Sequence, residues 1–237
     1  MRQICILLFI SSYTLLLQAQ INDPKVTEVW EPEPKIVDIQ KNNIPSDAIV
    51  LSDQMWTHKD GSPINWAVEN GVMTVKKGAG PIFTKDKFGD CQLHVEWRSP
   101  KEIKGEGQGR GNSGIFLQNK YEVQILDSHE NRTYSNGQAG SIYKQRMPLV
   151  NAMSPPGEWN SYDIVYKAPH FNDDGIKTSS AYITVIHNGV LIQNHYEIKG
   201  TTPYIGLPKN PAHQNDVIQI QDHGNPVSFR NVWIRKL

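Results

Sequence analysis

The strongest constraint on the fold is an alternation of apolar and polar residues that runs without a break from position 91 to 98. Within Cys91–Arg98, Cys, Leu, Val and Trp alternate with Gln, His, Glu and Arg. Side chains of a β-strand point in turn to opposite faces of a sheet, so this period of two predicts a strand with one buried face. No window of 12 or more residues keeps a helical stripe. The chain is therefore expected to be built from strands.

Two Asn-Gly pairs, Asn70-Gly71 and Asn188-Gly189, separate further strand-like runs. Asn-Gly favours the positive φ angles of a type I′ hairpin, and strands joined by tight hairpins are antiparallel. Many short strands divided by turn residues are typical of a sandwich or barrel. We expect an all-β antiparallel β-sandwich, a jelly roll with a concave ligand-binding face. The expected strands are 66–68, 72–75, 91–97, 113–117, 121–125, 162–166, 182–186, 190–192, 217–220 and 229–234.

The first residues have the layout of a secretory signal. A short basic start precedes an almost wholly apolar run, Ile4–Leu17, and the small residue Ala19 lies at a plausible cleavage point. The run is shorter than the roughly 18 residues that a membrane-spanning helix needs, although an N-terminal anchor is an alternative. We expect a signal peptide at 1–20, an extended proline-containing lead-in at 21–47 and one domain at 48–237. The mature protein would be periplasmic or secreted and free of the membrane.

Composition narrows the class of partner. The chain has 24 Lys and Arg against 24 Asp and Glu, with a sequence pI near 7.1, so it lacks the basic stripe of a nucleic-acid-binding protein. Only Cys91 remains after signal cleavage, which excludes an intramolecular disulfide and leaves stability to the hydrophobic core. A neutral or weakly charged partner fits this balance best.

Polar residues that point outward from strands are the candidates for a binding groove. On the expected strand at 121–125, Glu122 and Gln124 share one face and the apolar residues the other, and Gln221 and His223 share a face near 217–220. Two plain alternatives are that Glu122 is a solvated strand residue and that His223 is an ordinary loop histidine. A divalent ion held by Glu122, Asp127 and His223 is a further possibility, although no established metal motif occurs.

A glycine-rich loop, Gly105–Gly114, contains the spacing Gly-x-Gly-x-x-Gly. The dinucleotide fingerprint requires a helix directly after these glycines, whereas here a strand follows, so nucleotide binding is not expected. The glycines would instead let the backbone approach a ligand and would leave Arg110 reaching into a groove.

The chain closely resembles the 3-keto-disaccharide hydrolase family, which has a concanavalin A-like or laminin G-like jelly-roll fold. The similarity covers roughly Ala48–Leu237. The motifs that carry it are FGDCQLHVEWRSP, GQGRGNSGIFLQNKYEVQILDS, GQAGSIYKQ, PPGEWNSYDIVYKAP, VIHNGVLIQNH and IQDHGNPVSFRNVWIRKL.

The resemblance implies cleavage of the glycosidic bond of a sugar that carries a ketone at its third carbon. The ketone acidifies the hydrogen on the second carbon, so a base can remove it, the aglycone is expelled from the first carbon, and water then adds. Laminarinase-type jelly rolls place carboxylates at three alternate positions on one strand, where this chain has only Glu122, followed by Gln124 and Leu126. A conventional two-carboxylate hydrolase is therefore not expected.

On the family motifs, Glu122 or His223 would be the base, and Arg110 or a divalent ion would stabilise the enolate. Gln124 and Gln221 would orient hydroxyl groups, and Asp222 would fix a loop or the histidine tautomer. The full set of expected site residues is Arg110, Glu122, Gln124, Asp127, Lys144, Gln221, Asp222, His223 and Arg230. No cofactor is certain, and a divalent ion is an option.

The oxidised sugar would come from a separate sugar 3-dehydrogenase, because this chain has no credible nucleotide site. The main alternative is a non-catalytic carbohydrate-binding module, since jelly rolls host both kinds of protein. An adhesive laminin G-like protein is a third. The sequence leaves open the aglycone, the anomeric preference, the oligomeric state and whether the product is hydrated.

Overall fold

The computed structural model describes residues 23–237 in two units, which we treat separately. Residues 23–36 are exposed throughout and contain a single turn of 3-10 helix, η1 (Pro24–Val26). The predicted signal peptide at 1–20 lies outside the described residues. The second unit, Val37–Leu237, holds every strand described below. In the described part of the chain, no helix combines the length and apolar character that a membrane crossing requires.

The larger sheet has eight strands, and all its pairs are antiparallel. Its order is β13-β12-β9-β6-β15-β4-β3, and β1 pairs with β15 beside this path. The strands are β13 (Val190–Ile198), β12 (Ala181–His187), β9 (Asn160–Lys167), β6 (Cys91–Arg98), β15 (Ser228–Lys236), β4 (Val72–Thr74), β3 (Ala67–Glu69) and β1 (Ile49–Val50).

The smaller sheet has five antiparallel strands in the order β2-β5-β14-β7-β8. They are β2 (Trp56–Thr57), β5 (Ile82–Thr84), β14 (Gln219–Ile220), β7 (Ser113–Leu117) and β8 (Tyr121–Ile125). A separate hairpin joins β10 (His170–Phe171) to β11 (Lys177–Ser179). The remaining elements are short 3-10 helices, η2 (Lys41–Asn43), η3 (Asp53–Met55), η4 (Gly107–Gly109) and η5 (Ser135–Gly137).

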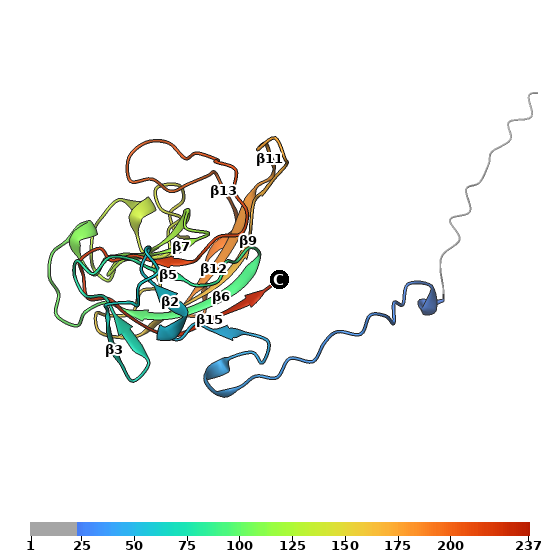
Figure 1. Cartoon of the computed structure of the whole chain (residues 1–237), viewed down its shortest axis with the longest axis horizontal. Coiled ribbons are helices and arrows are strands. Elements are labelled where there is room, and N and C mark those ends of the chain that lie inside the picture. Colours follow the sequence, from blue (N-terminus) through green and yellow to red (C-terminus); the bar gives the residue numbers. More distant parts are fainter. Residues whose placement is uncertain (1–22) are drawn as a thin grey trace, which may run out of the picture. The chain divides into compact units, whose positions relative to one another are not determined.

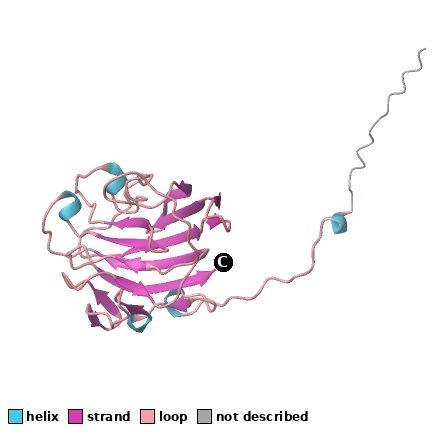
Figure 2. Ribbon diagram, turned by 45° about the horizontal axis from the view of Figure 1, so that its top comes forward, coloured by secondary structure: helices cyan, strands magenta, loops and turns pink. Residues whose placement is uncertain are grey.

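The hydrophobic core lies between the two sheets, which form the layers of a sandwich (Figures 1 and 2). Leu93 and Trp97 of β6 have no exposed surface, and neither do Val123 and Ile125 of β8. These residues alternate along their strands with polar residues that face away from the core. The structure is an antiparallel all-β jelly-roll sandwich, as predicted.

The two Asn-Gly hairpins are confirmed. Asn70 and Gly71 have φ angles of 50° and 76°, and Asn188 and Gly189 have 51° and 79°, as a type I′ turn requires. Glu69 pairs with Val72 across the first turn, and His187 with Val190 across the second. Strands β7 and β8 begin and end where the sequence predicted.

The sequence missed the shortest strands. β1, β2 and β10 have two residues each, and β5 and β11 have three, which is too short for a period of two to be detected. β14 also covers only two residues of the run predicted at 217–220. These strands form because segments elsewhere in the chain present backbone groups to pair with, as β15 does for β1 and β14 for β5, and no local pattern carries this information.

Truncating a core residue in the middle of the larger sheet tests the sandwich packing. Ile164 of β9 has no exposed surface, whereas its neighbour Val165 is 48% exposed. Ile164→Ala should lower the free energy of unfolding by about 2–5 kcal/mol, because it leaves a cavity. Val165→Ala is the matched control and should cost less than about 1 kcal/mol in chemical denaturation. Equal losses would contradict the assignment of the two faces.

Candidate active site

A pocket of about 270 Å³ lies over the outer face of the smaller sheet. Glu122 and Gln124 of β8 point into it because they alternate with the core residues of that strand. Phe116 of β7, which pairs with Glu122, contributes from the neighbouring strand. The lining residues are Asn112, Phe116, Glu122, Gln124, Tyr143, Thr202, Tyr204, Gln221 and His223. Four predicted site residues, Glu122, Gln124, Gln221 and His223, thus share one pocket.

The free edge of β8 is covered by chain segments that complete the pocket. The backbone N–H of Gln124 donates to Ser141, and that of Tyr143 donates to the Glu122 carbonyl, at 3.0 and 3.1 Å. On the same edge, the Glu122 N–H donates to the Thr202 hydroxyl at 3.0 Å. These bonds place Tyr143 beside Glu122 on the outer face of the sheet. The covering segments also remove Glu122 from water.

Glu122 carries the one carboxyl group among the residues that line the pocket. The residue is 5% exposed, and burial raises the pKa of its carboxyl group to about 8. Burial disfavours the charged form of a carboxyl group, and no salt bridge within residues 23–237 offsets this effect at Glu122. A carboxyl group with a pKa near neutrality can accept and return a proton at the pH of most biological fluids.

Gly114 makes room for this carboxyl group. It lies on β7 opposite Gln124, and a Cβ atom built on it would overlap Oε1 of Glu122. The absence of a side chain at this position therefore allows Glu122 to lie down against the sheet. Glycine is therefore required here so that the Glu122 carboxyl group can approach the β7 backbone closely. The sequence pattern Gly109-x-Gly111-x-x-Gly114 indicated a close approach to the backbone in this loop, but not which group makes it.

Tyr143 and Tyr204 line the pocket, and Tyr134 packs against Tyr143. The hydroxyl groups of Tyr134 and Tyr143 are 2.7 Å apart, and burial is the main reason that the pKa of Tyr143 is raised. Nζ of Lys144 donates to the Tyr204 carbonyl at 3.0 Å and lies 4.6 Å from the centre of the Tyr204 ring. Lys144 does not line the pocket, but through these contacts it connects the segment after β8 to the loop that carries Tyr204.

Arg110 and Asp127 face a different, smaller pocket of about 170 Å³. Nε of Arg110 donates to the Asp127 carboxylate at 2.7 Å, and Nη2 donates to the His129 carbonyl at 2.8 Å. Both residues are buried, and their charges neutralise each other. The structure therefore does not bring Arg110 and Asp127 to the pocket of Glu122.

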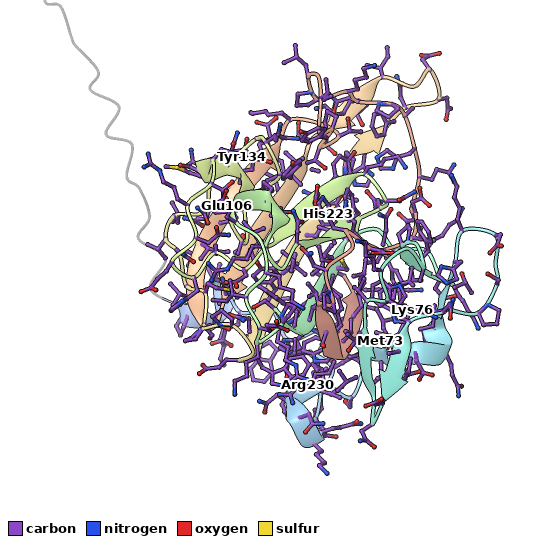
Figure 3. All side chains as sticks on the ribbon, turned by 90° about the vertical axis from the view of Figure 1, so that its left-hand side faces the viewer. Met73, Lys76, Glu106, Tyr134, His223 and Arg230 are labelled. Atoms are coloured by element: carbon purple, nitrogen blue, oxygen red, sulfur yellow. The ribbon has the colours of Figure 1, made fainter. Side chains whose placement is uncertain are left out.

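Asp222 holds the turn that presents His223. Its two carboxylate oxygens accept from the N–H groups of Gly80 and Gly224, at 2.9 and 2.8 Å. His223 is exposed at the rim of the pocket. Arg230 lies well away from it, as Figure 3 shows, because β15 belongs to the other sheet, and it donates to Glu96 at 2.6 Å.

The described residues form no ready metal centre. No group of three or more His, Cys, Asp or Glu side chains within residues 23–237 has the arrangement of metal ligands. The trio considered from the sequence is divided, since Asp127 binds Arg110 in one pocket while Glu122 and His223 line another. These three side chains do not make one ligand set here.

Residues 47–235 match the 3-keto-alpha-glucoside-1,2-lyase-like domain. The chain belongs to this family. It is 26% identical over 218 residues to a 3-keto-disaccharide hydrolase of Bacteroides thetaiotaomicron, a match that covers 76% of this chain and 72% of the relative. These matches support glycoside cleavage as the general activity of this 3-keto-alpha-glucoside-1,2-lyase-like domain.

Crystal structures of similar proteins have the same fold as this chain. A candidate glycosyl hydrolase of Parabacteroides distasonis ATCC 8503 is 50% identical, with a TM-score of 0.87 over 91% of this chain and 97% of the other. A second protein of that bacterium, also a candidate glycosyl hydrolase, is 22% identical with a TM-score of 0.56 over 78% of this chain and 89% of its own. At that identity the second likeness shows the shared fold alone.

Several residues that line the pocket of this lyase-like domain were not predicted from the sequence. Tyr143 belongs to the quoted motif GQAGSIYKQ, where Ile142 is buried and Tyr143 must face the other way once the segment pairs with β8. That pairing is an isolated bridge between Val123 and Ile142, and no local pattern predicts it. Thr202 and Tyr204 were missed for the same reason, since their segment reaches β8 from far along the chain. Phe116 pairs with Glu122 on the predicted strand 113–117, and Asn112 directly precedes this strand, so alternation along it could have indicated both.

The raised pKa of Glu122 predicts a specific dependence of stability on pH. Between the ordinary value near 4.5 and about 8, the folded protein keeps a proton that the unfolded chain releases, so rising pH favours unfolding. Glu122→Gln should remove this pH-dependent loss of stability, so the variant should be more stable than the wild type above about pH 8. The gain relative to wild type should reach a few kcal/mol, at roughly 1.4 kcal/mol per pKa unit.

Urea denaturation at a series of pH values measures this difference. Glu69→Gln on the exposed strand β3 is the matched control and should follow the wild type at every pH. A Glu122→Gln curve parallel to wild type would show that the carboxyl group titrates normally.

Substitution of Gly114 should disturb the site directly. Gly114→Ala forces the Glu122 carboxyl group to move, and we expect a loss of about 1–3 kcal/mol of stability together with a changed pKa of Glu122. Gly109→Ala is the control, because a Cβ atom there meets nothing within 4 Å. Thermal unfolding and a pH titration of both variants check this, and equal behaviour would contradict the close approach.

Proposed function

We propose that this domain cleaves the glycosidic bond of 3-keto-glycosides by removing the proton on the second carbon, eliminating the aglycone and adding water. The observation that carries the proposal is the buried Glu122 carboxyl group, whose pKa of about 8 suits a base, in a pocket otherwise lined by uncharged polar and aromatic side chains and His223. Family membership supports glycoside cleavage, and the relative from Bacteroides thetaiotaomicron is named for a 3-keto-disaccharide.

The first step would transfer the proton on the second carbon to the Glu122 carboxylate. The electrons of that C–H bond form a double bond between the second and third carbons, and the ketone oxygen becomes an enolate oxygen. The bond between the first carbon and the aglycone oxygen then breaks, and this oxygen leaves with its electron pair and takes up a proton. Water finally adds at the first carbon and a proton returns to the second, so the net reaction is hydrolysis.

Glu122 is the favoured base, because His223 lies at the exposed rim whereas Glu122 lies in the pocket. In this proposal, His223 would deliver a proton to the departing aglycone at the mouth of the pocket. The Tyr143 hydroxyl and the Gln221 amide line the same pocket and would donate to the enolate oxygen and to sugar hydroxyls. Tyr143 and Gln221 replace Arg110 as the proposed donors to the enolate oxygen, because the Arg110 guanidinium group already binds Asp127.

The proposed reaction requires an upstream oxidation. A separate sugar 3-dehydrogenase would supply the ketone, and the partner of this chain would be its carbohydrate substrate. We also propose that the chain is exported, since Met1–Gln20 has the composition of a secretory signal. Both proposals are independent of the pocket geometry.

The decisive assay gives the purified protein a 3-keto-glucoside and, separately, the unoxidised parent glucoside, with and without a chelator. Aglycone release from the keto compound alone is expected. Release from the parent would contradict the elimination mechanism and favour ordinary hydrolysis. Binding without release from either compound, over a panel of aglycones and added metals, would favour the carbohydrate-binding module instead. Loss of activity with chelator would add a metal ion to the scheme.

Glu122→Gln should lower kcat by about 10²–10⁴-fold, the usual contribution of a general base. In the wild type, kcat/KM should rise with pH and level off above about pH 8, because Glu122 must lose its proton to act. Glu69→Gln should leave both unchanged. Near-normal turnover in Glu122→Gln, measured with the 3-keto-glucoside, would remove Glu122 from the mechanism.

A further inference from the structure

We propose that Gln108 and Asn112 fix the orientation of the Gln124 amide, and that this amide in turn favours the protonated form of Glu122 in the resting protein. We call the three amide side chains the amide relay. The inference rests on the proposed function for its catalytic meaning, because Glu122 is the base there, although the relay itself is a statement about protonation.

The two outer members of the relay are anchored by backbone carbonyl groups. Nε2 of Gln108 donates to the Gly137 carbonyl at 2.9 Å and to the Thr133 hydroxyl at 3.1 Å. Nδ2 of Asn112 donates to the backbone carbonyl of Gln108 at 2.7 Å. A carbonyl oxygen can only accept, so each of these amides must direct its nitrogen to its anchor. Their oxygens therefore point elsewhere.

Both of these oxygens point at the same end of the Gln124 amide. Nε2 of Gln124 is 3.0 Å from Oε1 of Gln108 and 3.4 Å from Oδ1 of Asn112. The two hydrogens of this nitrogen satisfy the two acceptors. Oε1 of Gln124 must then lie at the other end of the amide, on the side of Glu122.

That other end meets two more oxygens. It lies 2.9 Å from Oε1 of Glu122 and 3.1 Å from the Ser113 carbonyl oxygen. Two oxygens without a hydrogen between them repel each other at 2.9 Å, and the Ser113 carbonyl oxygen carries no proton to donate. The contact becomes a hydrogen bond when Glu122 is protonated and its O–H donates to Gln124. The anchored relay thus favours the neutral acid, in the same direction as burial.

Loss of the proton would reverse the relay. An ionised Glu122 is stabilised when the Gln124 amide rotates by half a turn. Its nitrogen then donates to Oε1 of Glu122 at 2.9 Å and to the Ser113 carbonyl at 3.1 Å. The Gln124 oxygen then faces Oε1 of Gln108, and Gln108 must turn as well. Its own oxygen would then lie against the Gly137 carbonyl, and a hydrogen bond would be lost. Gln108 therefore opposes ionisation of Glu122 without touching it.

No other side chain in the described part of the chain forms a hydrogen bond with the Glu122 carboxyl group. Tyr134, Tyr143 and Tyr204 face Glu122 from the covering segments, and His223 faces it from the turn after β14. Within residues 23–237, none of them makes a hydrogen bond to the Glu122 carboxyl group. Lys144 is directed to the ring and carbonyl of Tyr204 instead. The Gln124 amide is thus the polar side-chain contact of this acid.

Infrared difference spectroscopy of the purified protein tests the relay without any substrate. The carbonyl band of a protonated Glu122, identified by its loss in Glu122→Gln, is followed against pH. Gln108→Leu removes the acceptor that fixes Gln124, so the amide can turn, and the pKa of Glu122 should fall by about one unit. Thr133→Val is the matched control. The Gly137 carbonyl still anchors Gln108 in this variant, so the pKa of Glu122 should stay the same or rise.

A second pair of variants shows whether the effect passes through Gln124. In a Gln124→Leu background, Gln108→Leu should cause no further shift. Circular dichroism checks folding, and Gln108→Met replaces Gln108→Leu if the branched side chain is not tolerated. An unchanged pKa in the folded Gln108 variant, or an equal fall in Thr133→Val, would overturn the relay.

The pH profile of kcat/KM for the 3-keto-glucoside separates the two proposals. If both hold, the acidic limb of Gln108→Leu moves to lower pH together with the infrared pKa. If the infrared pKa falls while the acidic limb stays, the relay stands and Glu122 is not the catalytic base. If the infrared pKa does not move, the relay is wrong whatever the activity.

Discussion

The proposed chemistry of this domain depends on one buried acid on a sheet face that would ordinarily meet water. Glu122 points away from the core of the sandwich, yet it is only 5% exposed, because two chain segments cover the edge of β8. Water is replaced there by aromatic rings and by amides whose hydrogen bonds are already committed. An acid in such a place gives up its proton reluctantly, and the resulting carboxylate is a stronger base than an exposed one.

The fold supplies this environment in two steps. The sandwich fixes the face of β8 by burying Val123 and Ile125, which leaves Glu122 and Gln124 on the outer side with the spacing of alternate strand residues. Pairing of Ile142 with Val123 then places Tyr143 next to Glu122. A slip of one residue in this register would exchange the buried and the outer side chains and remove the site. The geometry of the pocket is therefore a consequence of core packing.

The sequence predicted the parts of this arrangement that a period of two can encode. The faces of β7 and β8 follow from alternation alone, and so does the outward direction of Glu122 and Gln124. Burial of Glu122 could not be predicted, because it results from loops at 138–146 and 199–209 that pair with β8 across large separations in sequence. From the sequence, a solvated strand residue and a buried base look the same.

Charge pairing explains the other difference between the predicted and the observed site. Arg110 and Asp127 are polar residues near the correct strand, and the sequence gives no sign that they satisfy each other. The 2.7 Å ion pair between them lies in a separate pocket, and no Lys or Arg is among the residues that line the pocket of Glu122. A cation beside Glu122 would have lowered its pKa and weakened it as a base. The pairing of Arg110 with Asp127 thus contributes to the site indirectly.

The most direct test of the central claim is hydrogen exchange on a substrate analogue that cannot eliminate. A 3-keto sugar without a leaving group on its first carbon is incubated with the protein in D₂O, and the hydrogen on the second carbon is followed by proton NMR. If Glu122 is the base, exchange should be rapid and enzyme-dependent with wild type and very slow with Glu122→Gln. Exchange at the uncatalysed rate with wild type, or equal exchange with both proteins, would contradict the account.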